Sequence, residues 1–341
     1  MNEEKTVDSI VTNEFDIDVI EDDIQQLDEK ILHLLLKDKT TNHNIIWATA
    51  DYESLGSGFE EFSEIQPELI TGVFSTVIQP RITKAQNTQD GRTREKAEVF
   101  TPCWICNKQN NLVDERWFGR PHVFNKEVEH TWISTLDKIE FPNSKKTWKK
   151  YVDAQRLEIS CGEAPYLVSR YDAVTGEKIP LRSRIGLLDR KLRVVDENAT
   201  TDKEWIEWVI RAFQSVYGFE YQGDNLLLAR ENLFYTFLDY YQARFHKKPD
   251  LALMRKIALI ISWNIWQMDG LKCVVPNSCK PIVAQQLSFF DMNAVEESCP
   301  GCTKNDVHKH TGKYCKIMDW RFKTSRTFIS MMKGGDVGGN V

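Results

Sequence analysis

Apolar and polar positions predict a mixed N-terminal region over residues 1–80. The apolar positions of residues 16–37, which end in ILHLLL, recur at helical spacing, so this stretch is predicted to be an amphipathic packing helix. Residues 45–80 contain shorter apolar runs, IIWATADY and ITGVFSTVIQP, which are typical of strands. Residues 82–96 are polar and basic, and we expect them to form a surface loop.

From residue 157 onward the pattern alternates between strands and helices. The expected elements are a strand LEISC, helices over 184–198 and 202–215, a strand VYGFEY, a long helix capped by Asp224, and a strand that ends at Asp269. Such alternation is typical of a parallel sheet, which binds ligands at the carboxyl ends of its strands. The sequence therefore predicts an α/β fold, with a Rossmann-like core over residues 81–290 and an insertion at 119–150.

Two further segments flank this alternation. A helix is expected after Pro102, because proline is common in the first turn of a helix. Cys103 and Cys106 lie at its start, and we expect them to be core residues. Residues 291–341 form a third region, with a Cys/His cluster, a strand-like segment RTFISMM and a glycine-rich end.

Composition indicates a chain that folds in water. Of the 341 residues, 41% are hydrophobic and 28% are charged, which suits a packed core. The sequence has no run of about 18 apolar residues and no basic-then-apolar leader, so we expect no membrane span, no secretory signal and a cytoplasmic location. Eight cysteines in that setting suggest reduced thiols or metal ligands.

Charge is distributed unevenly along the chain. The net charge of −6 does not indicate a nucleic-acid-binding protein, but the segment 182–193, RSRIGLLDRKLR, is basic. A basic face of this kind binds phosphates, and the alternative is an ordinary solvated helix face. The candidate DNA-binding residues are Arg182, Arg184, Arg190, Lys191 and Arg193.

Three expected strand ends carry candidate ligand-binding residues. Small residues in the turn Ser160-Cys161-Gly162-Glu163-Ala164 would let a ligand approach the backbone, where free N–H groups are available. Glu220 could accept hydrogen bonds from two ribose hydroxyls, and Asp269 from an exocyclic amine. Together these strand ends predict a nucleoside-shaped ligand at the edge of the sheet.

The order of these motifs resembles a family, the amino-methyltransferases of bacterial restriction–modification systems that methylate adenine N6 in DNA. The matching segments are EVFTP (98–102), ISCGEAPYL (159–167), YGFEYQGDNLLLAREN (217–232) and NIWQMDGL (264–271). The resemblance covers roughly residues 80 to 275. It implies a class I methyltransferase core that binds S-adenosylmethionine and acts on DNA.

The resemblance also implies roles for nine residues. Phe100, Thr101 and Pro102 would cover the methionine end of the cofactor. Cys161, Gly162 and Ala164 would form the turn beneath it, with Glu158 near the first position of that turn. Glu220 would hold the ribose, and Asp269 the adenine amine.

The chain departs from the family pattern at several points. The first residue of the turn is normally Asp or Asn, but Glu158 or Ser160 stands near it, and Ala164 replaces the second glycine. The long gap between Gly162 and Glu220 requires an inserted piece. None of the eleven prolines is adjacent to another, so the catalytic Asn/Asp-Pro-Pro-Tyr/Phe segment is unmatched and no catalytic residue is assigned.

These departures leave more than one function open. The favoured expectation is the cofactor-binding half of a methyltransferase, with a catalytic or restriction partner subunit that supplies the missing motif. The first alternative is a catalytically silent, methyltransferase-like DNA-binding subunit with a structural zinc. The second is a nicotinamide-dependent oxidoreductase, although the turn after LEISC has one glycine where that motif needs three.

The segment CPGCTKNDVHKHTGKYC has the composition of a zinc site. Its five candidate ligands for four positions are Cys299, Cys302, His308, His310 and Cys315. We favour the three cysteines with one of the two histidines. The alternatives are a reduced-thiol loop without metal and a nuclease of the His-Asn-His type, which normally needs a second cysteine pair.

Overall fold

A three-stranded parallel sheet lies at the centre of the computed structural model, which describes residues 21–84, 101–284 and 295–332. Its strands are β3 (Arg156–Ile159), β4 (Val216–Glu220) and β5 (Ile265–Gln267), hydrogen-bonded in that order. In this register Glu158 lies beside Gly218, and Glu220 beside Gln267. The structure thus confirms the α/β class and the three strands expected in the core.

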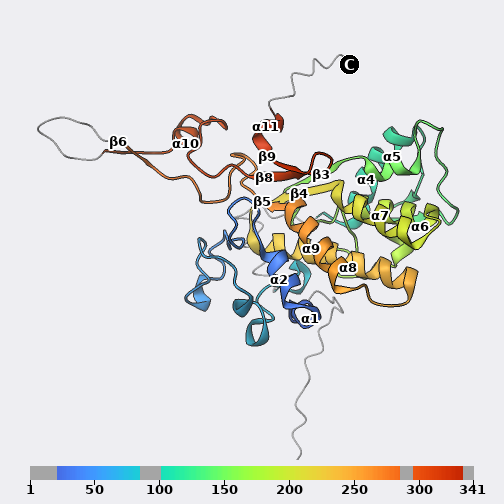
Figure 1. Cartoon of the computed structure of the whole chain (residues 1–341), viewed down its shortest axis with the longest axis horizontal. Coiled ribbons are helices and arrows are strands. Elements are labelled where there is room, and N and C mark those ends of the chain that lie inside the picture. Colours follow the sequence, from blue (N-terminus) through green and yellow to red (C-terminus); the bar gives the residue numbers. More distant parts are fainter. Residues whose placement is uncertain (1–20, 85–100, 285–294, 333–341) are drawn as a thin grey trace, which may run out of the picture.

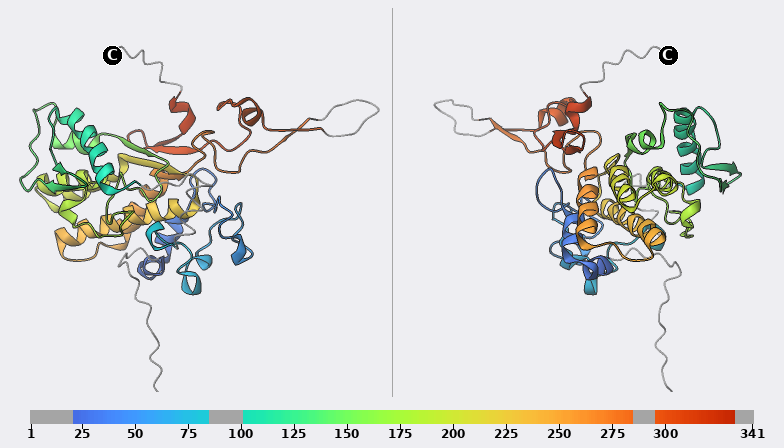
Figure 2. Two further views of the ribbon diagram at one scale, coloured as in Figure 1. Left: turned by 180° about the vertical axis from the view of Figure 1, so that it is seen from behind. Right: turned by 45° about the vertical axis from the view of Figure 1, so that its right-hand side comes forward.

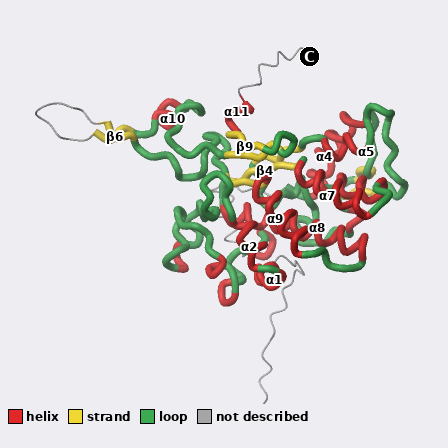
Figure 3. The backbone as a smooth tube through the Cα atoms, in the orientation of Figure 1, coloured by secondary structure: helices red, strands yellow, loops and turns green. Residues whose placement is uncertain are grey.

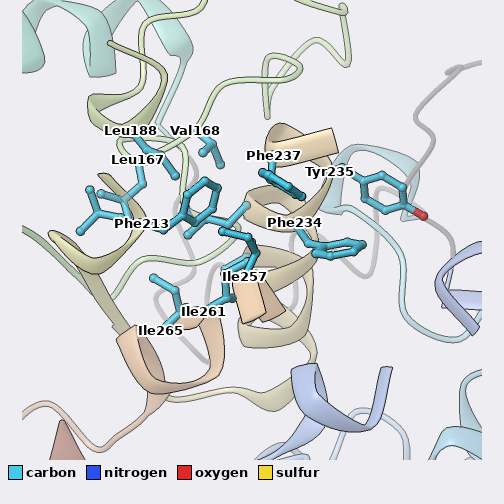
Figure 4. Packing of buried hydrophobic residues seen from close by; sticks show 14 of the residues in the cluster. Leu167, Val168, Leu188, Phe213, Phe234, Tyr235, Phe237, Ile257, Ile261 and Ile265 are labelled. Carbon is cyan, nitrogen blue, oxygen red and sulfur yellow. The ribbon is translucent and has the colours of Figure 1, made fainter. Parts of the chain in front are cut away.

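Helices connect these strands and cover one face of the sheet (Figure 1). They are α6 (Leu187–Asn198), α7 (Asp202–Gln214), α8 (Gly223–Phe245) and α9 (Leu251–Asn264). Ile265 packs in this layer with Phe213 and Ile261 (Figure 4), and Val216 of β4 belongs to the same buried cluster. Each such large apolar side chain contributes about 1.5–3 kcal/mol on burial.

The C-terminal segment covers the opposite face of the sheet (Figure 2). It consists of β8 (Lys316–Asp319), β9 (Thr324–Thr327) and α11 (Phe328–Met332). Tyr217 and Trp266 alternate with the residues that face the helices, and they pack against this segment. The predicted strand RTFISMM is wrong over Phe328–Met332, which forms helix α11. A short apolar run fits a helix turn as well as a strand.

The N-terminal region is less regular than its apolar runs suggested, and it appears mostly as loops in Figure 3. The expected helix breaks at Asp28 into α1 (Glu21–Leu27) and α2 (Glu29–Leu36), because the Asp28 carboxylate caps α2 by accepting from the Lys30 N–H at 2.9 Å. The strands expected in 45–80 are not formed; single turns and one bridge, between Ile46 and Glu64, replace them. The turns are η1 (Glu53–Leu55), η2 (Pro67–Leu69) and η3 (Gly72–Phe74), and a further turn, η4 (Arg81–Thr83), follows them.

Helix α4 (Cys103–Phe118) begins directly after Pro102, as expected, and both of its cysteines are buried in the core. The predicted insertion that follows contains β1 (Asn125–Val128), β2 (Thr131–Ser134) and α5 (Trp148–Asp153), and η5 (Leu181–Ser183) comes later in the chain. The expected cap of α8 is wrong. Gln222 occupies the N-cap, and Asp224 lies buried in the first turn, where it accepts from the Tyr52 hydroxyl at 2.7 Å.

Along the chain between β5 and β8, an extended hairpin arm leaves the body of the molecule (Figure 1). It contains β6 (Ile282–Ala284) and β7 (Val295–Glu297), which pair antiparallel, and it is followed by the short helix α10 (Pro300–Lys304). None of the described helices is long and apolar enough to cross a membrane.

Candidate functional site

A cavity of about 870 Å³ opens at the carboxyl ends of β3 and β4. Five of the nine residues predicted to bind a cofactor line it: Thr101, Glu158, Cys161, Gly162 and Glu220. They come from three segments that are far apart in the sequence. The described part of the chain therefore brings most of the expected site together at the expected edge of the sheet.

The turn after β3 has an unusual backbone. Ser160, Gly162 and Ala164 have φ angles of 49°, 52° and 64°, in the left-handed region that favours glycine. The turn is held by two backbone donors: the Cys161 N–H bonds to the Phe219 carbonyl at 2.9 Å, and the Gly162 N–H to Oε2 of Glu220 at 2.8 Å. The side chain at the end of β4 therefore fixes the shape of the turn after β3.

Two acidic side chains, Glu220 and Glu158, lie at the inner wall of the cavity. Oε1 of Glu220 accepts from the Tyr221 and Gln222 N–H groups, at 2.9 and 3.3 Å. The Glu158 carboxylate accepts from the N–H groups of the segment that leaves the turn, at 3.3 and 3.1 Å. Burial raises the pKa of both carboxyl groups, and for Glu158 the nearby Glu220 raises it further.

The other expected cofactor residues lie elsewhere. Asp269 does not line the cavity; its carboxylate accepts from the Leu271 and Lys272 N–H groups, both at 3.1 Å, and pairs with Lys272 Nζ at 3.0 Å. Pro102 precedes α4 as its N-cap, and Ala164, at the end of the turn, is fully buried in the hydrophobic core. Phe100 lies outside the described residues.

Several cavity residues had no role in the sequence-based prediction. Asn110 of α4 lines the cavity and donates from Nδ2 to the carbonyls of Tyr166 and Ile185, both at 3.0 Å. The only feature of the sequence that could have indicated Asn110 is the amide-rich run NKQNN in α4. Ala48 and Glu61 also line the cavity, although they belong to the N-terminal region, and no sequence pattern connects them to the sheet edge.

The basic stretch 182–193 does not form the exposed face that was predicted for DNA. Arg190 is 1% exposed, and its guanidinium pairs with Asp114 at 2.6 Å and donates to Asn107 and Asn111, both at 2.8 Å. Lys191 is also buried; its amine donates to Ser215 Oγ at 2.5 Å and to the Ala154 carbonyl, and burial lowers its pKa. Neither side chain can reach a phosphate from the interior.

Two of the remaining three basic candidates also form ion pairs within the chain. Arg184 pairs with Asp239 at 2.7 Å, and Arg193 pairs with Glu197 at 2.7 Å while donating to two backbone carbonyls. Arg182 is exposed. The stretch therefore contributes mainly to the packing of α6, and the sequence could not distinguish a buried, paired cation from a solvated one.

A group of potential metal ligands forms near the hairpin arm. The ligand atoms of Cys279, Cys299, Cys302 and His310 all lie within 4.8 Å of one another, so a metal could bind there. The favoured ligand set is corrected at one position: Cys315 packs on the sheet, with its thiol 3.3 Å from the Gln267 carbonyl, and Cys279 takes its place. His308 is exposed and outside the group.

Comparison with models of known families, with curated proteins and with solved structures found no match for this chain. The cavity and the Cys₃His group are therefore the two features from which its function can be inferred. They lie in different parts of the molecule and share no residue.

Proposed function

We propose that the cavity binds S-adenosylmethionine and that the chain is the cofactor-binding subunit of a DNA adenine-N6 methyltransferase in a restriction–modification or phage-defence system. One observation carries the proposal. Residues that the family pattern assigns to the cofactor, at position 101, in 158–162 and at 220, converge on a single cavity. That cavity opens where a parallel sheet ordinarily binds its ligand.

The size and chemistry of the cavity suit a nucleoside. Its volume of about 870 Å³ falls within the range of about 300–1,000 Å³ typical of small-molecule sites. The Glu220 carboxylate accepts from three backbone N–H groups and can accept one further hydrogen bond, as from a ribose hydroxyl, and Asn110 and Gln222 add polar groups to the lining. The three adjacent parallel strands are consistent with one half of a Rossmann-like sheet.

Base chemistry is assigned to a partner chain in this proposal. The printed sequence has no adjacent prolines, so the family's catalytic segment is unmatched in it. The same observation favours the second candidate, a catalytically silent methyltransferase-like subunit. The assignment of residues 182–193 to DNA binding in that candidate has less support, because Arg190 and Lys191 are buried.

Calorimetric titration of the full chain with S-adenosylmethionine tests cofactor binding. We expect Glu220→Gln to weaken binding roughly tenfold or more, because a hydrogen bond to a charged group contributes about 1.5–3 kcal/mol. Asp269→Asn makes the same carboxylate-to-amide change after the neighbouring strand, outside the cavity, and should bind like the wild-type chain.

Three results would count against the proposal. The first is no heat of binding for the wild-type chain, with or without candidate partner subunits. The second is unchanged affinity of a Glu220→Gln variant that is folded by circular dichroism. Binding of NADH in place of S-adenosylmethionine would support the nicotinamide alternative.

A further inference from the structure

The Cys₃His group joins two segments that are also linked by hydrogen bonds, such as those between Lys280 and Thr311 and between Ser278 and Lys313. Cys279 belongs to the loop after β5, whereas Cys299, Cys302 and His310 lie around α10. We propose that these four side chains bind one Zn²⁺ ion, which fastens the C-terminal segment to the sheet. This site is independent of the proposed cofactor cavity, because it shares no residue with it.

The distances within the group fit tetrahedral zinc. His310 Nδ1 lies 3.7 Å from the sulfurs of Cys279 and Cys299 and 3.6 Å from that of Cys302. A tetrahedral ion with Zn–S bonds of about 2.3 Å and a Zn–N bond of about 2.0–2.1 Å places nitrogen and sulfur roughly 3.6 Å apart. One nitrogen at that distance from three sulfurs is the arrangement such an ion requires.

The surroundings of the ligands also suit a metal. The Thr311 N–H points at the sulfur of Cys299 at 3.2 Å, a hydrogen bond that orients a ligating thiolate. A Cβ on Gly301 would lie 2.5 Å from the backbone nitrogen of His310, and one on Gly312 would lie 3.0 Å from the sulfur of Cys279. Both glycines therefore allow the close approach of chain segments that brings the ligands together.

Four protein ligands indicate a structural site. A catalytic zinc normally keeps one position open for water or substrate, whereas Cys₃His closes the coordination shell. Most residues between Cys302 and Lys313 are exposed or half-buried, so this stretch has little apolar core of its own. A zinc ion supplies the stability that such a loop-rich segment lacks.

The segment that follows the metal ligands covers one face of the sheet. Directly after the last ligand segment, Cys315, Ile317 and Ile329 cover the face of the sheet that carries Phe219 and Trp266. Backbone bonds such as Val275 N–H to the Lys313 carbonyl, at 2.8 Å, link the metal group to this cover. Loss of the ion should therefore loosen the C-terminal segment and expose Trp266.

Metal content of the purified full chain is the direct test. Elemental analysis should find one zinc per chain, and it should fall to background in Cys302→Ser, whose exposed side chain has little packing to lose. His310→Ala should behave alike. His308→Ala, two residues away and outside the group, and Cys315→Ala should keep the metal.

A second measurement holds even if a variant fails to fold. Treatment of the wild-type chain with a chelator should make residues 299–332 sensitive to protease and shift the tryptophan fluorescence, and added Zn²⁺ should reverse both effects. Replacement by Co²⁺ should give a spectrum with thiolate-to-metal charge transfer. A chain that takes up neither ion after reduction, or that loses zinc in Cys315→Ala but not in Cys302→Ser, would overturn the proposal.

Discussion

The cavity at the turn after β3 and the basic stretch 182–193 place their ionisable side chains in different surroundings. Glu220 and Glu158, on the strands beside the turn, line a cavity. Glu220 accepts from the Gly162 N–H in the turn, and Glu158 accepts from the Leu167 N–H in the segment that leaves it. In the basic stretch, Arg190 points away from solvent to Asp114 on α4. One region places carboxyl groups at a ligand-sized space, and the other uses a charged side chain to join two helices.

The difference teaches that a charged sequence pattern does not specify its partner. A strand end in a parallel sheet has a defined neighbour, so the position of Glu220 follows from the topology. A cation on an amphipathic helix has no such constraint. Whether it meets water, a phosphate or a buried carboxylate depends on which surface packs against that helix.

Arg190→Met should produce the largest effect of the changes that test this comparison. Removal of the guanidinium leaves the Asp114 carboxylate buried without its ion-pair partner, which typically costs about 3–5 kcal/mol. Urea unfolding measures the loss. The matched change at the exposed Arg182 should stay within about 0.5 kcal/mol. Equal stability of the two variants would mean that the stretch is solvated after all.

Glu158→Gln should alter how stability depends on pH. Burial raises the folded-state pKa of Glu158 above its usual value of 4.5, so the folded chain retains a proton that the unfolded chain has released. Stability from this group is present below about pH 4.5 and is lost as pH rises through the folded pKa. The Gln variant should therefore gain on the wild type over the pH range above about 4.5. A constant difference across that range would contradict this role of burial.

Glycine substitutions in the turn after β3 should have the smallest effects, and Ser160→Gly is the clearer of two. Ser160 is exposed and has a φ of 49°, so glycine relieves an unfavourable conformation and should raise stability by up to about 1 kcal/mol. Ala164→Gly relieves a φ of 64° but removes a fully buried methyl group, so its net change should be smaller. Thermal unfolding compares the two, and a destabilised Ser160→Gly would show that the turn is not strained.

Local pattern predicted much of the core. The helices around Trp205 and Leu192 and the strands that end near Ile159 and Glu220 follow from spacing and length alone, because regular elements repeat their apolar positions. The pattern failed in 45–80. There Trp47 is buried against Tyr52 and Phe59, which irregular turns and not a strand bring to it, and a run of apolar residues looks the same in both cases.

The sequence by itself determined the α/β alternation, the turn at Gly162 that now borders the cavity, and three of the four residues of the metal-binding group. Only the tertiary structure decided that Cys279 joins that group in place of Cys315, that Ala48 reaches the cavity, and that Arg190 is buried. The reason is physical. Element type depends on neighbours a few residues away, whereas the partner of a thiol or a charge is chosen by the packing of segments that the chain brings together from far apart.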